Sequence, residues 1–540
     1  MKNIGKLNRV VDYGNYAVYA IVALIGLVVN WLILDKCLVM SDDAWYLCLL
    51  RDLPEGLTSS GHLLFGNIFN NNIYAIRTAC YVLNVISGFV FAIGLFCFAG
   101  ERNCFSLGKN YRRNVLFNIL LWSFVIFAGQ LRIVTCPSFN YITINQIIMQ
   151  LSLGMLLIAV SRRNRVAMFF SGFFVAVLVP VMITNTIVIP VIFFFVAAYL
   201  YYTLRHNNGE KVFWKDLTKW LIVYVLGMFL FLAIYFVFVQ DIRSYLDAFL
   251  NNVNETISRG ENEYGLKFLC KWLHRTMVFY FMQVVMLAVL LHYIPVFSSL
   301  LKLGRKSAFV VKLLLYFAVF VYIRAAVNYD AMFFMMLLAF YLFLDENNVG
   351  DRRTQLIFML LILMPICLSF GTNNFFPDRG NEYMAFVAPL LLFCSTKWYH
   401  KFLSSGVLIF YAVEFCMSLY SPTWHSDVYA EQKYDIRQLG IEQELYVDKN
   451  TYGRLEAMMP YLHSGDTVWC DTESWGFVEL LNLVPITYKY RMNPALVDSV
   501  GLVFVRKEAR YSEMVEYLNS LDGYDEVSYG RFSLFVKRRE

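Results

Sequence analysis

Long runs of apolar side chains, separated by short polar segments, fill most of the chain up to residue 420. A helix needs about 20 apolar residues to cross the hydrocarbon core of a bilayer, and this length predicts about thirteen membrane spans here. They fall near residues 15–35, 73–99, 114–131, 141–160, 166–183, 187–204, 218–240, 276–298, 310–327, 331–344, 355–370, 382–396 and 402–420. The two spans joined at residues 183–186 are expected to form a tight hairpin. Those near 331, 355 and 382 are short enough to be tilted or partly re-entrant.

The pattern changes after Tyr420, and residues 421–540 are typical of a small soluble α/β domain. Residues 465–470 and 501–505 read as strands, because each is a short apolar run that follows a glycine. Helical periodicity is expected in three further segments, at residues 454–462, 475–483 and 511–521. A last hairpin over residues 526–536 is expected to turn at Tyr529 and Gly530.

Basic residues fall in alternate loops, which predicts the orientation of the spans. With a cytoplasmic N-terminus, the basic loops all lie on the cytoplasmic side; they contain Arg112, Arg163, Lys211, Arg305, Arg352 and Lys397, among others. Loops 36–72 and 241–275 and the C-terminal domain are then exoplasmic. The chain is thus expected to be an α-helical, multi-pass membrane domain, residues 1–420, followed by an exoplasmic α/β domain.

Composition supports a membrane protein and argues against other classes. Hydrophobic residues make up 59% of the chain and charged residues only 16%. The net charge of +6 is spread over short loops, so nucleic acid is not an expected partner. The first apolar run has no small-residue cleavage site after it, which predicts a retained anchor rather than a signal peptide. The 11 cysteines include no CxxC pair and no cluster with His at metal-ligand spacing.

Two adjacent acids, Asp42 and Asp43, follow the first predicted span and precede Trp45 and Tyr46. Carboxylates at the edge of a bilayer are costly and therefore point to function, whereas the plainer interpretation is a solvated loop. The aromatic pair suits the membrane interface. The stretch is thus the first candidate for a catalytic site.

With its many spans, an acid pair in the first external loop and a C-terminal α/β domain, the chain resembles the GT-C superfamily of membrane glycosyltransferases. This group includes aminoarabinose transferases and protein O-mannosyltransferases. The resemblance implies a bacterial inner-membrane enzyme that moves a sugar, with inversion, from a polyprenyl-phosphate carrier to lipid A, a surface glycan or a protein. It also implies that Asp42 is the catalytic base. Asp43 then tunes Asp42, binds the acceptor or helps to hold a divalent metal, so metal dependence stays open.

The carrier phosphate calls for cationic side chains at the exoplasmic ends of spans, because a guanidinium binds phosphate oxygens through paired hydrogen bonds. Arg324 is the first candidate, with an ion pair to Asp330 as the structural alternative. The other substrate-binding or phosphate-binding candidates are His62, Arg132, Asn140, Tyr141 and Arg379, with Arg77 as a weaker one. Asn140 and its neighbours have helix capping as their structural alternative. The Lys-Pro-Pro stretch that aminoarabinose transferases carry in the first loop is absent, which leaves the sugar and the acceptor open.

Two other functions remain as alternatives. A polysaccharide polymerase or ligase with a diphosphate-linked donor would use basic residues in a large external loop, and loop 241–275 carries Arg243, Arg259, His274 and Arg275. A secondary transporter would predict internal repeats and broken helices at the bilayer midplane. The sequence shows no such repeat, and the appended α/β domain argues against transport.

Overall fold

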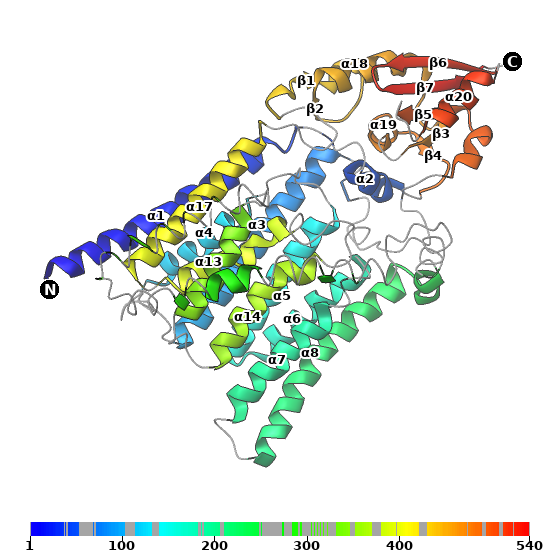
Figure 1. Cartoon of the computed structure of the whole chain (residues 1–540). Helices are drawn as coiled ribbons and strands as arrows, with labels where there is room; N and C mark the ends of the chain where they lie inside the picture. The colour runs from blue at the N-terminus through cyan, green and yellow to red at the C-terminus, as the bar shows by residue number, and fades with distance from the viewer. Residues whose placement is uncertain are drawn as a thin grey trace. The chain divides into compact units, whose positions relative to one another are not determined.

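The chain is mostly helical and has a small sheet near its C-terminal end, as the computed structural model shows (Figure 1). The structure describes residues 2–36, 38, 42–52, 68–69, 72–102, 114–131, 140–181, 185, 188–205, 210–247, 331–345, 352–369, 380–395, 397–420, 429–471, 474–488, 493–506, 511–521 and 523–538, with scattered positions between 250 and 321.

Among these described residues, five helices are long and apolar enough to cross a membrane. They are α1 (Lys2–Leu32), α3 (Ile73–Arg102), α5 (Tyr141–Arg162), α8 (Glu210–Phe238) and α17 (Trp398–Ser418). Shorter helices are α4 (Val115–Ala128), α6 (Arg165–Val181), α7 (Val188–Arg205), α13 (Ala331–Asp345) and α14 (Arg352–Leu368). Apolar helices of membrane length are thus present, while the total of about thirteen spans stays a prediction. The expected spans near 276–298 and 310–327 lie largely outside the described residues.

The span expected near residues 382–396 is not one continuous α-helix. A 3-10 helix, η4 (Asn381–Phe386), is followed by the six-residue helix α16 (Ala388–Phe393). Tyr383 has φ −114° and ψ 18°, which lies outside the helical region. Pro389 in the first turn of α16 has no N–H to donate, so the helix restarts there instead of continuing from η4.

The described chain divides into two compact units. Unit 1 contains residues 1–28, 83–133 and 145–415, and unit 2 contains residues 29–82, 134–144 and 416–540. The polypeptide therefore passes between the units inside α1, α3, α5 and α17, and once more between residues 133 and 134. The segment after the first long helix belongs to the same unit as the C-terminal sheet.

Glycines allow close crossings between helices of unit 1. A Cβ at Gly94 of α3 would lie 2.6 Å from the carbonyl oxygen of Gly154 on α5. A Cβ at Gly172 of α6 would meet the carbonyl of Tyr224 on α8. The predicted hairpin of residues 166–183 and 187–204 needs correction: α6 packs mainly on α8, and α7 packs mainly on α14. The reason is this small-residue contact, which brings the α6 and α8 backbones together.

Polar side chains join α1 to α17 at one end of unit 1, and the two helices lie side by side (Figure 1). Asp12 forms an ion pair with Lys401. One turn further along, the Ser405 hydroxyl donates to Asn15 Oδ1 at 2.7 Å. The first and last long helices of the described chain are therefore joined by polar contacts, which are costly to leave unmade inside an apolar bundle.

Unit 2 contains a five-stranded sheet of order β4-β3-β5-β7-β6. Strands β3 (Thr467–Cys470), β4 (Val484–Pro485) and β5 (Leu502–Arg506) are parallel, and β6 (Tyr524–Tyr529) and β7 (Phe532–Lys537) form an antiparallel hairpin. The helices are α18 (Lys449–Met458), α19 (Trp475–Leu480) and α20 (Ser512–Ser520), with the short 3-10 turns η6 (Ile436–Leu439) and η8 (Pro494–Ser499). A small pair, β1 (Tyr434–Asp435) and β2 (Tyr446–Val447), precedes the sheet.

The strands and helices predicted for the C-terminal segment are confirmed. Gly465, at φ +88°, forms the turn that leads into β3, and Gly530, at φ +59°, forms the hairpin turn. Phe477 of α19 stacks on Phe504 of β5 with ring centroids 5.3 Å apart, so the helix covers one face of the sheet. This part of the chain is a small α/β module.

The α6–α8 crossing gives a direct test of packing in unit 1. We expect Gly172→Ala to lower the free energy of unfolding in detergent by about 1–3 kcal/mol, since the added methyl overlaps a backbone carbonyl. Gly406→Ala in α17 is the matched control, because a Cβ at Gly406 meets no atom within 4 Å. The measurement is the folded fraction after heating, read by size-exclusion chromatography. Equal stability of the two variants would contradict the close crossing.

Candidate functional site

The acid pair opens a helix. Helix α2 spans Asp42–Asp52, within the predicted loop 36–72, for which the sequence pattern indicated no helix. The side chains of Asp42 and Asp43 lie outside the described part of the chain. Their positions in the first turn of α2 place them at the positive end of the helix dipole, which stabilises negative charge.

The other predicted site residues divide into two groups. His62, Arg132, Arg324 and Arg379 lie outside the described residues, so their roles stay predictions. Asn140 and Tyr141 are described and belong to unit 2, the same unit as α2.

Asn140 caps the helix that it precedes. Its side-chain Oδ1 accepts hydrogen bonds from the Thr143 backbone N–H at 3.0 Å and from the Thr143 hydroxyl at 3.2 Å. This is the capping alternative that the sequence left open. The next residue, Tyr141, places its ring edge-on to the ring of Tyr46 in α2, with centroids 5.8 Å apart. Two stretches that were predicted to form one site are thus brought together, through Tyr46 and Tyr141.

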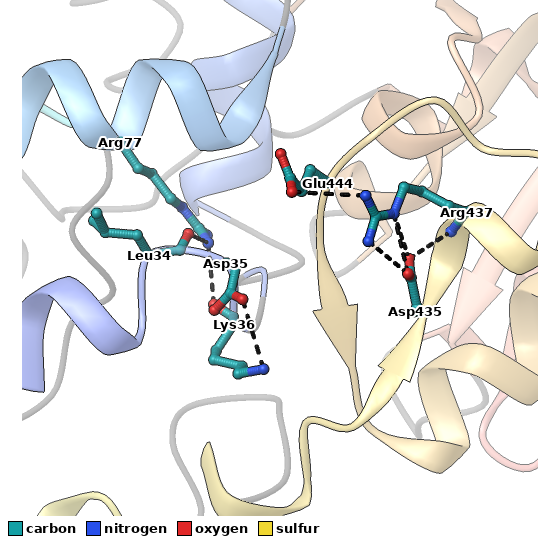
Figure 2. A network of polar contacts seen from close by, with 7 residues as sticks. All are labelled: Leu34, Asp35, Lys36, Arg77, Asp435, Arg437 and Glu444. Carbon is teal, nitrogen blue, oxygen red and sulfur yellow. Dashed lines mark hydrogen bonds and ion pairs between the residues drawn. The ribbon is translucent and has the colours of Figure 1, made fainter.

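The turn before α2 is held by a buried arginine. Arg77, in the first turns of α3, is 1% exposed. Its Nη1 donates to the carbonyl oxygens of Leu34 at 3.1 Å and Lys36 at 3.0 Å, as Figure 2 shows. Arg77, a weaker phosphate candidate in the sequence, therefore fixes the path of the chain between α1 and α2.

The same turn contacts the first strand pair of the C-terminal segment. The Tyr446 N–H donates to the Asp35 carbonyl at 2.7 Å, and Lys36 Nζ lies 3.8 Å from the centroid of the Tyr446 ring. The Ile73 N–H donates to Gln443 Oε1 at 3.0 Å. An exposed ion pair, Arg437 with Asp435, is drawn beside this region in Figure 2. Both ends of the segment that contains α2 are thus tied to residues 443–446.

Helix α2 packs one face against α19. Its buried side chains include Ala44, Leu47, Cys48 and Leu50, none of them more than 4% exposed. Trp45 donates from Nε1 to the Tyr488 carbonyl oxygen at 2.9 Å. The first two positions of the helix are acidic, while the turns that follow are anchored to the α/β module.

Arg51, near the end of α2, is the centre of this interface. Its guanidinium makes a bidentate pair with Asp52 at 2.8 Å for both bonds. It also donates to the carbonyls of Val478 at 3.2 Å and Leu483 at 2.7 Å. Its Nη1 lies 3.2 Å from Glu479 Oε2. Burial lowers the pKa of Arg51, but the Asp52 hydrogen bonds and the Glu479 charge outweigh it, so the guanidinium stays charged.

Glu479 of α19 is 3% exposed and titrates near neutrality. Burial raises the pKa of Glu479 to about 7; the Arg51 charge and the Cys48 thiol lower it, while the Asp52 charge raises it. A single guanidinium between two carboxylates leaves a net negative charge once Glu479 ionises. The folded interface favours the protonated form of Glu479. This preference stabilises the folded state fully below pH 4.5, and the stabilisation is lost as pH rises through about 7.

Tyr488 links both ends of α2. Its carbonyl accepts from Trp45, and its hydroxyl hydrogen-bonds to Asp52. Burial and the Asp52 charge raise the pKa of Tyr488 to about 12, so it remains a donor at neutral pH. Within the described part of the chain, no three His, Cys, Asp or Glu residues come together as metal ligands. The side chains of Asp42 and Asp43 are not part of that set.

Sequence reasoning missed Arg51, Glu479 and Tyr488. A signal was present in two of them: Arg51 follows an apolar run, and Glu479 interrupts another, Trp475 to Leu483. A charged residue on an apolar, buried face needs a hydrogen-bonding or charged partner. The sequence does not reveal the partner, since Arg51 and Val478 are separated by 427 positions.

The role of Asn140 can be tested with two substitutions. We expect Asn140→Ala to cost about 1 kcal/mol of stability, and Asn140→Asp to restore it because a carboxylate caps equally well. Thermal unfolding of the purified protein measures both. If Asn140→Asp is stable but no longer binds a ligand that the wild type binds, the amide N–H serves the ligand as well as the cap. If Asn140→Ala is as stable as the wild type, the cap is not what holds this helix end.

Comparison of the chain with protein-family models and with curated proteins gave no match in either case.

Proposed function

We propose that the chain is an integral membrane glycosyltransferase that moves a sugar from a polyprenyl-phosphate carrier to an exoplasmic acceptor, with Asp42 as the general base. The observation that supports it most is the position of the acid pair: Asp42 and Asp43 open helix α2, soon after the first membrane-length helix. The helix is then anchored by Trp45 and Arg51, while its first two positions are the acids.

The chemistry requires few groups. Asp42 takes the proton from the acceptor hydroxyl, the acceptor oxygen bonds to the anomeric carbon, and the bond from that carbon to the phosphate oxygen breaks. The polyprenyl phosphate leaves with the electron pair, and a cationic side chain balances its charge. Arg324 is our candidate for this role, with His62, Arg132 and Arg379 as further candidates. General base catalysis by a placed carboxylate contributes about 10²–10⁴ in rate.

The compact units support a common location for the acid pair and the C-terminal module. Residues 29–82 and 416–540 belong to one compact unit, which supports a common location for them on one side of a membrane. The distribution of Lys and Arg predicts that this side is exoplasmic. An acceptor on the outer surface would then meet the site directly, in the inner membrane of a bacterium.

The acid pair gives the main test. We expect Asp42→Asn to lower turnover by about 10²-fold or more with little change in donor binding, because the amide keeps the shape but not the basicity. Asp43→Asn should lower it less. The measurement is sugar transfer from a synthetic polyprenyl-phosphate donor by the purified variants. Wild-type turnover of Asp42→Asn would end the assignment, and equal loss in both would indicate a shared metal or a coupled pair. Transfer only from a diphosphate-linked donor would favour the polymerase or ligase alternative.

A second test concerns the phosphate. We expect Arg324→Ala to raise the donor KM strongly while the protein yield is maintained, and Arg324→Lys to keep part of the affinity because the charge remains without the paired donors. Titration with the donor measures both. If Arg324 only pairs with Asp330, yield should fall instead, and exchanging the two residues should restore it.

A further inference from the structure

We propose that Arg51 is a positioning residue: it fixes α2 on α19 and on Leu483, the residue before β4, and thereby holds the acid pair in place, and protonation of Glu479 tightens this attachment. The inference rests on the proposed function and adds how the catalytic acids are positioned and how that positioning responds to pH. Arg51 acts through α2 and not through contact with the substrate.

The contacts of Arg51 come from three directions. Asp52 fixes the guanidinium on α2 through two 2.8 Å hydrogen bonds, which leaves the outer N–H groups aimed at the α/β module. There they reach the Val478 and Leu483 carbonyls and the Glu479 carboxylate. A planar guanidinium held on both sides in this way allows little rotation of the helix end.

The surface that receives Arg51 is the edge of a sheet. β4 is the terminal strand of the five-stranded sheet, and Leu483 immediately precedes it. Pro485 in β4 has no N–H, as suits an edge strand that does not pair further. The Leu483 carbonyl, at the start of this edge strand, is therefore satisfied by a side chain of α2.

The length of α2 turns a small loss of attachment into a large displacement of the acids. Asp42 lies nine positions before Arg51, roughly 13 Å along a helix axis. A tilt of about 10° at the Arg51 end would move Asp42 by about 2 Å, and a 1 Å misplacement can lower a rate about 10²-fold. Positioning through Arg51 should hence act on kcat more than on the donor KM.

Glu479 makes the attachment sensitive to pH. The titratable and charged groups around it are Arg51, Asp52 and Cys48 from α2, with Tyr488 on Asp52 and Cys470 beside Cys48. A neutral Glu479 leaves Arg51 balanced by Asp52 alone. An ionised Glu479 adds a buried negative charge, so the α2–α19 contact weakens as pH rises through about 7.

Cys48 provides a native reporter that does not depend on activity. Its thiol is fully buried, and it hydrogen-bonds to Glu479. Burial raises the pKa of Cys48 well above its usual range, which further slows alkylation while α2 is attached. Cys270 is exposed and serves as the internal reference for reagent and pH effects.

The experiment uses the full-length protein in lipid nanodiscs, with maleimide alkylation followed by peptide mass spectrometry and with kcat measured on the same samples. We expect Arg51→Lys to raise Cys48 alkylation, relative to Cys270, by about tenfold and to lower kcat at least as much with little change in KM. Arg437→Lys is the matched control, since this exposed arginine also pairs with an aspartate in unit 2. It should change neither quantity.

The pH profile separates positioning from simple stabilisation. In the wild type, the alkylation ratio of Cys48 to Cys270 should rise between pH 6 and pH 8, and in Glu479→Gln it should stay low over the same range. This comparison tests whether Glu479 controls the attachment of α2 even if Arg51→Lys does not fold. A ratio that rises equally in both proteins, or an Arg51→Lys variant with wild-type protection of Cys48, would overturn the attachment.

The outcome also distinguishes this inference from the proposed function. Exposed Cys48 in Arg51→Lys with wild-type kcat would overturn positioning and leave glycosyl transfer standing. Absence of transfer in the wild type, together with the expected alkylation pattern, would overturn the proposed function and with it the catalytic part of this inference.

Discussion

One buried guanidinium determines how the segment after the first long helix is arranged. Arg51 carries its charge into an interface where it is 8% exposed, and every direction in which it donates is met by a carboxylate or a carbonyl. An unpaired charge there would cost several kcal/mol, so the helix cannot shift without breaking several bonds at once. The contacts of Arg51 fix α2 and thereby the position of the acid pair at the start of this helix.

The arrangement also explains why a membrane protein would carry this α/β module. The module receives α2 on its helix α19 and at Leu483, the residue before β4. In addition, residues 443–446 hold the turn before α2 and the start of α3. The module therefore supports the segment that contains α2 at both of its ends.

Much of the fold follows from local pattern, and the remainder depends on distant contacts. Strands β3 and β5 were predictable, because each is a short apolar run beside a glycine, and the final hairpin was predictable from its turn at Tyr529 and Gly530. The acid pair stood out because two carboxylates follow a long apolar run. Helix α2 was missed, since its polar first turn and its buried Arg51 obscure the helical period. Likewise, the α6–α8 pairing depends on Gly172 against Tyr224 and on Gly227 against Phe169, contacts that no local rule predicts.

The separation of α2 from the C-terminal α/β module along the chain has a consequence for biosynthesis. Arg51 and Val478 are 427 positions apart, and a ribosome adding 5–20 residues each second needs about 20–85 s to cover that distance. During that interval α2 presents Leu47, Leu50 and a charged Arg51 with no module to receive them. The nascent chain thus depends on the membrane surface or on a chaperone to shield this helix until its last quarter is made, and a premature stop would leave the helix exposed for good.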